Sequence, residues 1–244
     1  MSKYSIRPIP IFKMPADKGI MTYRLNYGQR IDLYNYTWYI ETPNAKILVD
    51  TGATAEMGGA HGFAGAQDIQ SPEEGLRPLK LRPEDIDIVI LTHLHWDHVA
   101  NASKFTKARF VIQKTELDFA KNPHPAVASA YDLNLFKDLN FEIVDGDKEI
   151  LKGLKVLFTP GHTPGGQSVA IETSKGLAVL TGFCCTSANF EPPIELKARG
   201  MQIITPGIHT NMLQAYDSVM RVKQIADIVL PVHDAGFLVK ERIP

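Results

Sequence analysis

The secondary structure that the sequence predicts is typical of β-sheets packed against one another with helices outside. Consecutive strands fill the first fifty residues, strands alternate with helices through the middle of the chain, and the alternation returns in the last third. This pattern alone leaves both α/β and α+β architectures open. We find no internal repeat and no linker rich in Gly, Ser or Pro, so we expect residues 1–244 to form a single domain.

The first ninety residues predict a meander of strands followed by a long connection. The expected strands, rich in aromatic and β-branched side chains, are residues 22–27, 33–41 and 46–50. Pro43 and Asn44 predict a turn between the last two. Residues 53–80 are rich in Gly, Ala and polar side chains, which predicts an irregular segment that closes over a pocket. Residues 86–91, apolar but for one aspartate, predict a buried strand.

The remainder of the chain predicts six further strands and three helices. The expected strands are residues 109–113, 141–144, 155–159, 168–172, 177–180 and 228–232. The expected helices are residues 114–121, 126–139 and 211–225. These elements complete the alternation from which the layered architecture is inferred.

Charge and cysteine content exclude several classes of protein. The chain has 26 Lys and Arg against 27 Asp and Glu, which is not the basic surface of a nucleic-acid or polybasic membrane protein. Its apolar runs are far shorter than the roughly 20 residues that span a bilayer. The two cysteines, Cys184 and Cys185, are adjacent and cannot form a framework of loop-closing disulfides. The first residues do not resemble a signal peptide, so we expect a cytoplasmic protein.

The segment after the strand at 86–91 concentrates potential metal ligands. His93, His95, Asp97 and His98 fall within six residues. If the chain is extended at His93, His95 lies on the same side, while Asp97 and His98 lie past a bend into a helix and address a neighbouring position. Imidazole and carboxylate suit zinc, and also iron or manganese. Such a density of ligands argues for a metal site over an ordinary structural role.

Two more histidines follow predicted strands and stand beside turn-forming residues. His162 lies in Pro160-Gly161-His162-Thr163-Pro164-Gly165, and His233 precedes Asp234. Alone, either histidine could belong to an ordinary turn; beside the cluster at 93–98, both become candidate ligands. The other histidines have no neighbouring ligand and are expected in loops or on the surface: His61, His124 and His209.

These motifs resemble those of the metallo-β-lactamase superfamily, in particular its N-acyl homoserine lactonase branch. The hallmark HxHxDH corresponds to residues 93–98, with Asp50-Thr51-Gly52 upstream and the His162 and His233 motifs downstream. The resemblance implies an α+β fold, the αββα sandwich. It also implies that His93, His95 and His162 hold one metal ion and that Asp97, His98 and His233 hold another. A hydroxide between the ions would be the nucleophile, oriented by Asp97 as the catalytic residue.

The chain departs from this family at Leu180 to Thr186. Members with two metals usually carry a bridging aspartate here, but no aspartate lies between Glu172 and Glu191, and Phe183 stands near the expected position. Two explanations remain open for Cys184: a replacement metal ligand, since a thiolate binds zinc well, or a small buried hydrophobe. Cys185 is expected to pack. Cys185 and Thr186 also stand where lactonases tend to have a tyrosine that contacts the substrate carbonyl.

The sequence therefore predicts a metal-dependent hydrolase that opens a small cyclic ester or amide, with a lactone favoured. The alternatives are a glyoxalase II-like thioesterase and an iron-dependent oxidoreductase on the same ligands. The expected cofactor is one or two zinc ions, with iron and manganese also compatible. Asp50 and Asp234 are expected to orient ligating imidazoles, or else to cap turns. The partner is a small-molecule substrate, and the oligomeric state is left open, a homodimer included.

Overall fold

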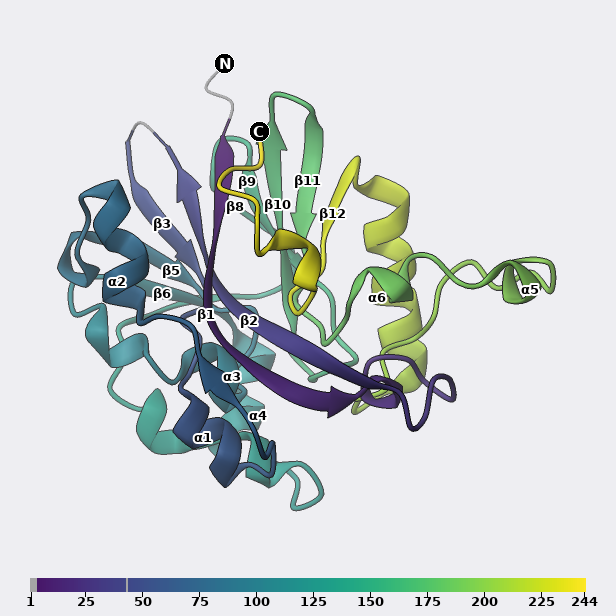
Figure 1. The fold of residues 1–244 in the computed structure, drawn as a ribbon. Helices are drawn as coiled ribbons and strands as arrows, with labels where there is room; N and C mark the ends of the chain where they lie inside the picture. Colours follow the sequence, from purple (N-terminus) through teal and green to yellow (C-terminus); the bar gives the residue numbers. More distant parts are fainter. Residues whose placement is uncertain (1–3, 43) are drawn as a thin grey trace.

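Two β-sheets lie face to face, and helices cover their outer faces (Figure 1). The computed structural model describes residues 4–42 and 44–244. The seven-stranded sheet has the order β4 (Gln67–Asp68), β1 (Ser5–Asp17), β2 (Arg30–Glu41), β3 (Lys46–Val49), β5 (Ile88–Ile90), β6 (Arg109–Gln113), β7 (Phe141–Val144). The five-stranded sheet has the order β12 (Ile228–Leu230), β11 (Gly176–Leu180), β10 (Gln167–Thr173), β9 (Leu154–Phe158), β8 (Lys148–Leu151). The α-helices in the described part of the chain are α1 (Ala55–Ala60), α2 (Pro72–Leu76), α3 (Trp96–Val99), α4 (Lys114–Lys121), α5 (Ile194–Lys197) and α6 (Met212–Ile225).

Alternation along the strands produces three apolar layers. In β3, Ile47 and Val49 face the core between the two sheets, whereas Leu48 faces the core beneath the helices that follow the first sheet. In the second sheet, Val179 packs against Val219 of α6. The order of layers is therefore helix, sheet, sheet, helix, which confirms the predicted αββα sandwich.

Parallel strands bring the chemically important loops to one edge of the molecule. Strands β3, β5, β6 and β7 run parallel, so Asp50 after β3 and His93 after β5 leave the sheet at the same edge. In the second sheet β11 and β12 are parallel, which places Cys184 and His233 at neighbouring strand ends. Function is commonly built from loops at such edges.

The N-terminal strand corrects the predicted meander. Residues 5–17 form the long strand β1, which the sequence did not predict because three prolines interrupt it. Apart from Ile6, which bridges Ile243, and Phe12 and Lys13, which pair with β4, β1 pairs with β2 alone, a setting that tolerates proline. The strand predicted at 22–27 is wrong: these residues form turns, in which Arg24 and Asn26 have positive φ.

Two other predicted segments also differ from the structure. Residues 126–139 contain only short 3₁₀ turns instead of a helix, and the Asp132 side chain accepts a hydrogen bond from the Asn134 N–H, a local bond that competes with a helix. Residues 53–80 contain α1, β4 and α2 and are less irregular than expected. The helix at 114–121 is confirmed and that at 211–225 begins at Met212, whereas strand β8 was not predicted. The turn at Pro43 lies outside the described residues.

None of the helices in the described part of the chain has the length and hydropathy to cross a membrane.

Candidate metal centre

The first ligand cluster joins loops from both sheets. His93 and His95 lie in the loop after β5, and His162 lies in the loop after β9. Their ligand atoms all lie within 4.8 Å of one another, and all three side chains are buried. His93 and His95 thus point towards the same position, as their spacing of two residues predicted, and the backbone of His95 is extended (ψ 148°).

The second cluster lies beside the first. Asp97 and His98 occupy the short helix α3, and His233 follows β12. Their ligand atoms also lie within 4.8 Å of one another. The rings of His93 and His98 are 4.1 Å apart between centroids, so the two clusters adjoin. The structure thus brings together all six side chains that the resemblance assigned to the two ions.

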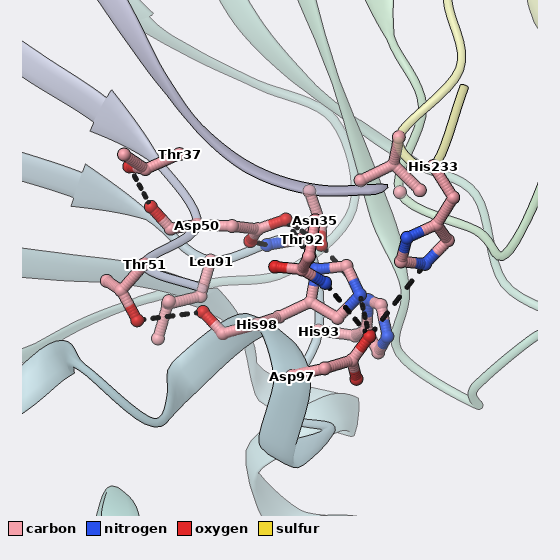
Figure 2. A network of polar contacts seen from close by, with 12 residues as sticks. Asn35, Thr37, Asp50, Thr51, Leu91, Thr92, His93, Asp97, His98 and His233 are labelled. Atoms are coloured by element: carbon pink, nitrogen blue, oxygen red, sulfur yellow. Dashed lines mark hydrogen bonds and ion pairs between the residues drawn. The ribbon is translucent and has the colours of Figure 1, made fainter. Parts of the chain in front are cut away.

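Asp50 orients one histidine of each cluster (Figure 2). Its Oδ2 accepts a hydrogen bond from His98 Nδ1 at 2.7 Å and another from Thr92 Oγ1 at 2.8 Å. Because the Thr92 hydroxyl gives its proton to Asp50, it accepts from His93 Nδ1 at 3.0 Å. Both imidazoles are therefore oriented with Nε2 towards the clusters, where it can bind a metal ion once it carries no proton.

Backbone carbonyls orient two further histidines in the same way. His162 Nδ1 donates to the carbonyl of Ile208 at 2.9 Å, and His233 Nδ1 donates to that of Tyr34 at 3.1 Å. A carbonyl accepts only, so the proton in each ring stands on Nδ1. Asp234, the other candidate for this role, instead caps a turn by accepting from the Gly236 and Ser187 N–H groups.

Burial keeps four of the histidines neutral. It lowers the pKa of His162 and of His233 to about 4. It lowers the pKa of His93 and His95 well below the ordinary value, with the neighbouring histidines adding to the effect. A neutral imidazole is the form that binds a metal ion.

His98 and Asp97 form a coupled pair. Burial opposes protonation of His98, but the carboxylates of Asp97 and Asp50 outweigh it and raise the pKa of His98 to about 10. Burial likewise opposes ionisation of Asp97, yet His98 holds the pKa of Asp97 below its ordinary value. In the metal-free chain a proton therefore takes the place of a cation at this cluster.

The donor set fits a divalent ion. The Nε2 atom of His93 is buried and has no hydrogen-bond partner among the described residues. An unsatisfied buried nitrogen is costly, and a metal ion would satisfy it. Five imidazoles and one carboxylate, with separations of this size, provide the nitrogen and oxygen ligands that zinc binds.

Where the bridging carboxylate is missing, Phe183 and Cys185 point into the core beneath α6, whereas Cys184 lines the same cavity as the clustered ligands. Phe183 is fully buried in the core beneath α6 and packs near Phe190. Cys184 belongs to neither cluster; its Sγ donates to Met21 Sδ at 3.5 Å, and burial, more than the nearby Asp97, raises its pKa. Its role as a ligand stays a prediction. Cys185 packs in the core, as expected.

A cavity of about 200 Å³ opens onto the clusters. Residues 53–80, expected to close over a pocket, contribute His61 and Phe63 to its walls, and Trp96, Ala130 and Ile208 also line it. The N-terminal residues that also line it were not expected: Met14, Ile20, Met21 and Leu33. The described lining contains no Lys or Arg, so the walls are mostly apolar around a polar floor.

Sequence reasoning missed several side chains that support the site. Asn35 donates to Asp97, and Glu116 accepts hydrogen bonds from backbone N–H groups in both histidine loops. Their contacts join residues far apart in sequence, for which no local motif exists. His61, expected only as a surface residue, is exposed but lines the cavity and stacks flat on Trp96 at 4.3 Å.

Comparisons with known proteins agree with this geometry. The model of the Metallo-beta-lactamase superfamily matches residues 30–224. An N-acyl homoserine lactonase from Bacillus cereus is 30% identical over 201 residues, which cover 76% of this chain and 78% of the relative. The crystal structure of a quorum-quenching N-acyl homoserine lactone lactonase superposes with a TM-score of 0.77 at 26% identity, covering 96% and 94% of the two chains.

A second solved structure shows a ligand in such a site. It is an N-acyl homoserine lactone hydrolase with the product N-hexanoyl-L-homoserine bound at its catalytic metal centre. It superposes with a TM-score of 0.75 at 27% identity, covering 96% of this chain and 94% of that chain.

Proposed function

The chain belongs to the metallo-β-lactamase superfamily, in its lactonase-like branch, and is a metal-dependent hydrolase; on this premise we propose that it opens the ring of N-acyl homoserine lactones or closely related lactones. The observation that carries the proposal is the pair of ligand clusters at the floor of one apolar cavity. We further propose that residues 1–244 act as one catalytic domain, since the Ile6 and Ile243 backbones pair at the two ends of the chain.

The proposed metal ligands are the six clustered side chains. His93, His95 and His162 would hold one ion, and Asp97, His98 and His233 a second, with zinc the proposed metal. A divalent ion there would lower the pKa of a bound water and polarise the carbonyl of the ester. Iron and manganese suit the same donors, so metal analysis belongs with every activity measurement.

The chain's own residues orient and enclose the substrate. Asp97 is the proposed catalytic carboxylate: it lines the cavity, and its lowered pKa keeps it ionised, so that it would accept a hydrogen bond from an attacking water and orient it. Phe63, Trp96 and Ile208 offer apolar walls to an acyl chain and exclude water from the ester. A thioesterase for an anionic thiol carrier would need a cationic wall, which the described lining does not provide.

The test is a substrate panel measured on protein of known metal content. The zinc-loaded protein is given N-acyl homoserine lactones of increasing chain length, simple γ-lactones and a glutathione thioester. Hydrolysis of each substrate is measured through the proton that the product acid releases. We expect kcat/KM for an acyl homoserine lactone of at least about 10⁴ M⁻¹s⁻¹, loss on chelation and recovery with zinc.

Paired substitutions connect this activity to the clusters. His162→Asn should abolish lactone opening, whereas His124→Asn, at an exposed histidine outside the cavity, should leave it unchanged. Turnover that survives complete chelation would refute a metal-dependent mechanism. A zinc-loaded protein that cleaves only the thioester would refute the proposed substrate.

A further inference from the structure

Asn35 is a buried polar residue in the middle of an otherwise largely apolar strand. It lies on β2 and is 1% exposed, between Tyr34 and Tyr36. Asparagine is disfavoured in strands, and a buried amide needs partners for both of its polar atoms. Its Nδ2 has a partner, but its Oδ1 has none among the described residues. Packing alone therefore does not account for an asparagine here.

The partner of Asn35 is a proposed metal ligand. Asn35 Nδ2 donates to Asp97 Oδ2 at 3.1 Å, across 62 positions of sequence (Figure 2). That oxygen is the one that faces the imidazoles of the second cluster, at 3.3 Å from His98 Nε2 and 3.9 Å from His233 Nε2. The hydrogen bond from Asn35 thus restrains the carboxylate oxygen that completes the cluster.

Strand β2 also contacts the second cluster through the residue before Asn35. The carbonyl of Tyr34 accepts from His233 Nδ1 at 3.1 Å, and the Tyr34 N–H donates to the His233 carbonyl at 3.3 Å. Consecutive residues of one strand therefore orient two of the three residues of this cluster. Among the described hydrogen bonds of His93, His95 and His162, none involves β2.

The second cluster has particular need of such support in this chain. No carboxylate lies in the segment after β11 where the family usually has a bridging aspartate, and Phe183 at that place is turned into a core. Asp97 is consequently the one acidic side chain among the six clustered residues. A free carboxylate can rotate about its last side-chain bond, so its orientation limits the affinity of the cluster for a cation.

We propose that Asn35 is a positioning residue that holds Asp97 Oδ2 in the metal-binding orientation and so sets the affinity of the Asp97–His98–His233 cluster for a divalent ion. The His93–His95–His162 cluster does not depend on it. This inference rests on the proposed metal-dependent function, but it concerns binding of the ion and is independent of the substrate.

The test is a titration of the demetallated protein with zinc. Binding is measured by calorimetry and by competition with a chromophoric chelator. Asn35→Leu keeps the approximate volume of the side chain and removes the donor. We expect one of the two binding steps to weaken about 10–100-fold, the usual effect of removing a group that supports a metal ligand. The other step should change less than about twofold.

Asn189→Leu is the matched control. Asn189 is also a buried asparagine, whose Nδ2 donates to the carbonyls of Met21 and Ile204, and it contacts none of the six clustered residues through these bonds. It should lower the melting temperature without changing either zinc-binding step. Should Asn35→Leu fail to fold, Asn35→Ser takes its place, because it also removes the amide donor but introduces a smaller side chain. It must weaken the same single zinc-binding step.

The outcomes separate the two proposals. Two unchanged binding steps in a folded Asn35 variant, or equal weakening of both, would overturn the role of Asn35. The visible spectrum of the Co²⁺-loaded protein gives a second readout, which should change only for the ion added in the affected step. A wild-type protein that binds no zinc at all would instead refute the proposed metal-dependent function.

Discussion

The Asp50 carboxylate connects the two clusters through two hydrogen bonds at one oxygen. It accepts directly from His98 and, through the hydroxyl of Thr92, supports His93. Its backbone has φ 56°, in the left-handed region that Asp and Asn tolerate better than other side chains. The position therefore needs a small residue that is also a strong acceptor.

Asp50→Asn tests this acceptor with little backbone disturbance. Asparagine also tolerates the left-handed conformation, but its single oxygen cannot accept from Thr92 and His98 as the carboxylate does. We expect zinc affinity to fall about 10–100-fold, with a matching loss of bound metal after dialysis. Nitrogen chemical shifts of the His98 ring should also show an altered tautomer. Two retained zinc equivalents with an unchanged His98 spectrum would contradict the assignment.

Four of the six clustered residues could be predicted from spacing alone, which is a local property, and the family resemblance added His162 and His233. His93, His95, Asp97 and His98 lie within six positions, and the motif around His162 is equally compact. Asn35 could not be found in this way, because its role depends on a contact across 62 residues. Asp50 was expected to support an imidazole, but not to support one in each cluster.

At the level of elements, two helices fix the loop that carries His162. A Cβ on Gly161 would lie 2.1 Å from the backbone nitrogen of Ala215 in α6, and one on Gly165 would lie 2.1 Å from that of Glu116 in α4. Glu116 Oε1 accepts from the Leu94 N–H and Oε2 accepts from the Gly165 N–H. Helix α4 thus joins the two loops of the first cluster through one buried carboxylate.

Gly165→Ala should disrupt this contact. The added methyl group meets backbone atoms of α4, which cannot move aside as a flexible side chain could. We expect a loss of about 1–3 kcal/mol in the free energy of unfolding, seen as a fall of several degrees in melting temperature. Gly59→Ala, in α1 with open space around its Cβ position, is the control and should be neutral or stabilising. Equal melting temperatures for both variants would contradict close packing at Gly165.

Helices and strands whose apolar residues recur at regular spacing could be predicted from the sequence. Those that form because of contacts with residues far away in the sequence could not. The buried strand β5 and the helices α4 and α6 follow from local pattern. Strand β1 contains three prolines and exists because β2 pairs with it along its length. Residues 126–139 have helical spacing, but 3₁₀ turns replace the helix and their apolar side chains Val127, Ala130 and Leu135 pack against the core.

Across the whole molecule, the sandwich gathers a set of buried titratable groups at the meeting of its two sheets. His93 and His95 come from the first sheet, and His162 and His233 come from the second. The family resemblance predicted this assembly, but the periodicity of the strands did not, because periodicity does not specify how two sheets are aligned. One consequence is that the stability of the metal-free protein must depend on pH.

We expect the metal-free protein to lose stability as the pH falls from 6.5 towards 4. The pKa of His162 and of His233 is about 4 in the folded chain, below the ordinary value of 6.5, so the unfolded state binds protons first. Their stabilising contribution is present above pH 6.5 and is lost below it, by roughly 2–3 kcal/mol for each histidine at pH 4. His98 acts in the opposite direction: its pKa is raised to about 10, so its contribution is complete below pH 6.5 and is lost as the pH rises towards 10.

The measurement is the midpoint of urea unfolding of chelated protein between pH 4 and 10, which should be highest near pH 6.5. His233→Asn removes one histidine of lowered pKa and should flatten the acid limb of the curve, whereas His124→Asn, at an exposed position, should not. Saturating zinc should increase the midpoint of urea unfolding, and the increase should be largest above pH 7, because metal ligands must be deprotonated to bind. A midpoint that stays constant from pH 6.5 to 4 would show that these imidazoles are not buried in neutral form.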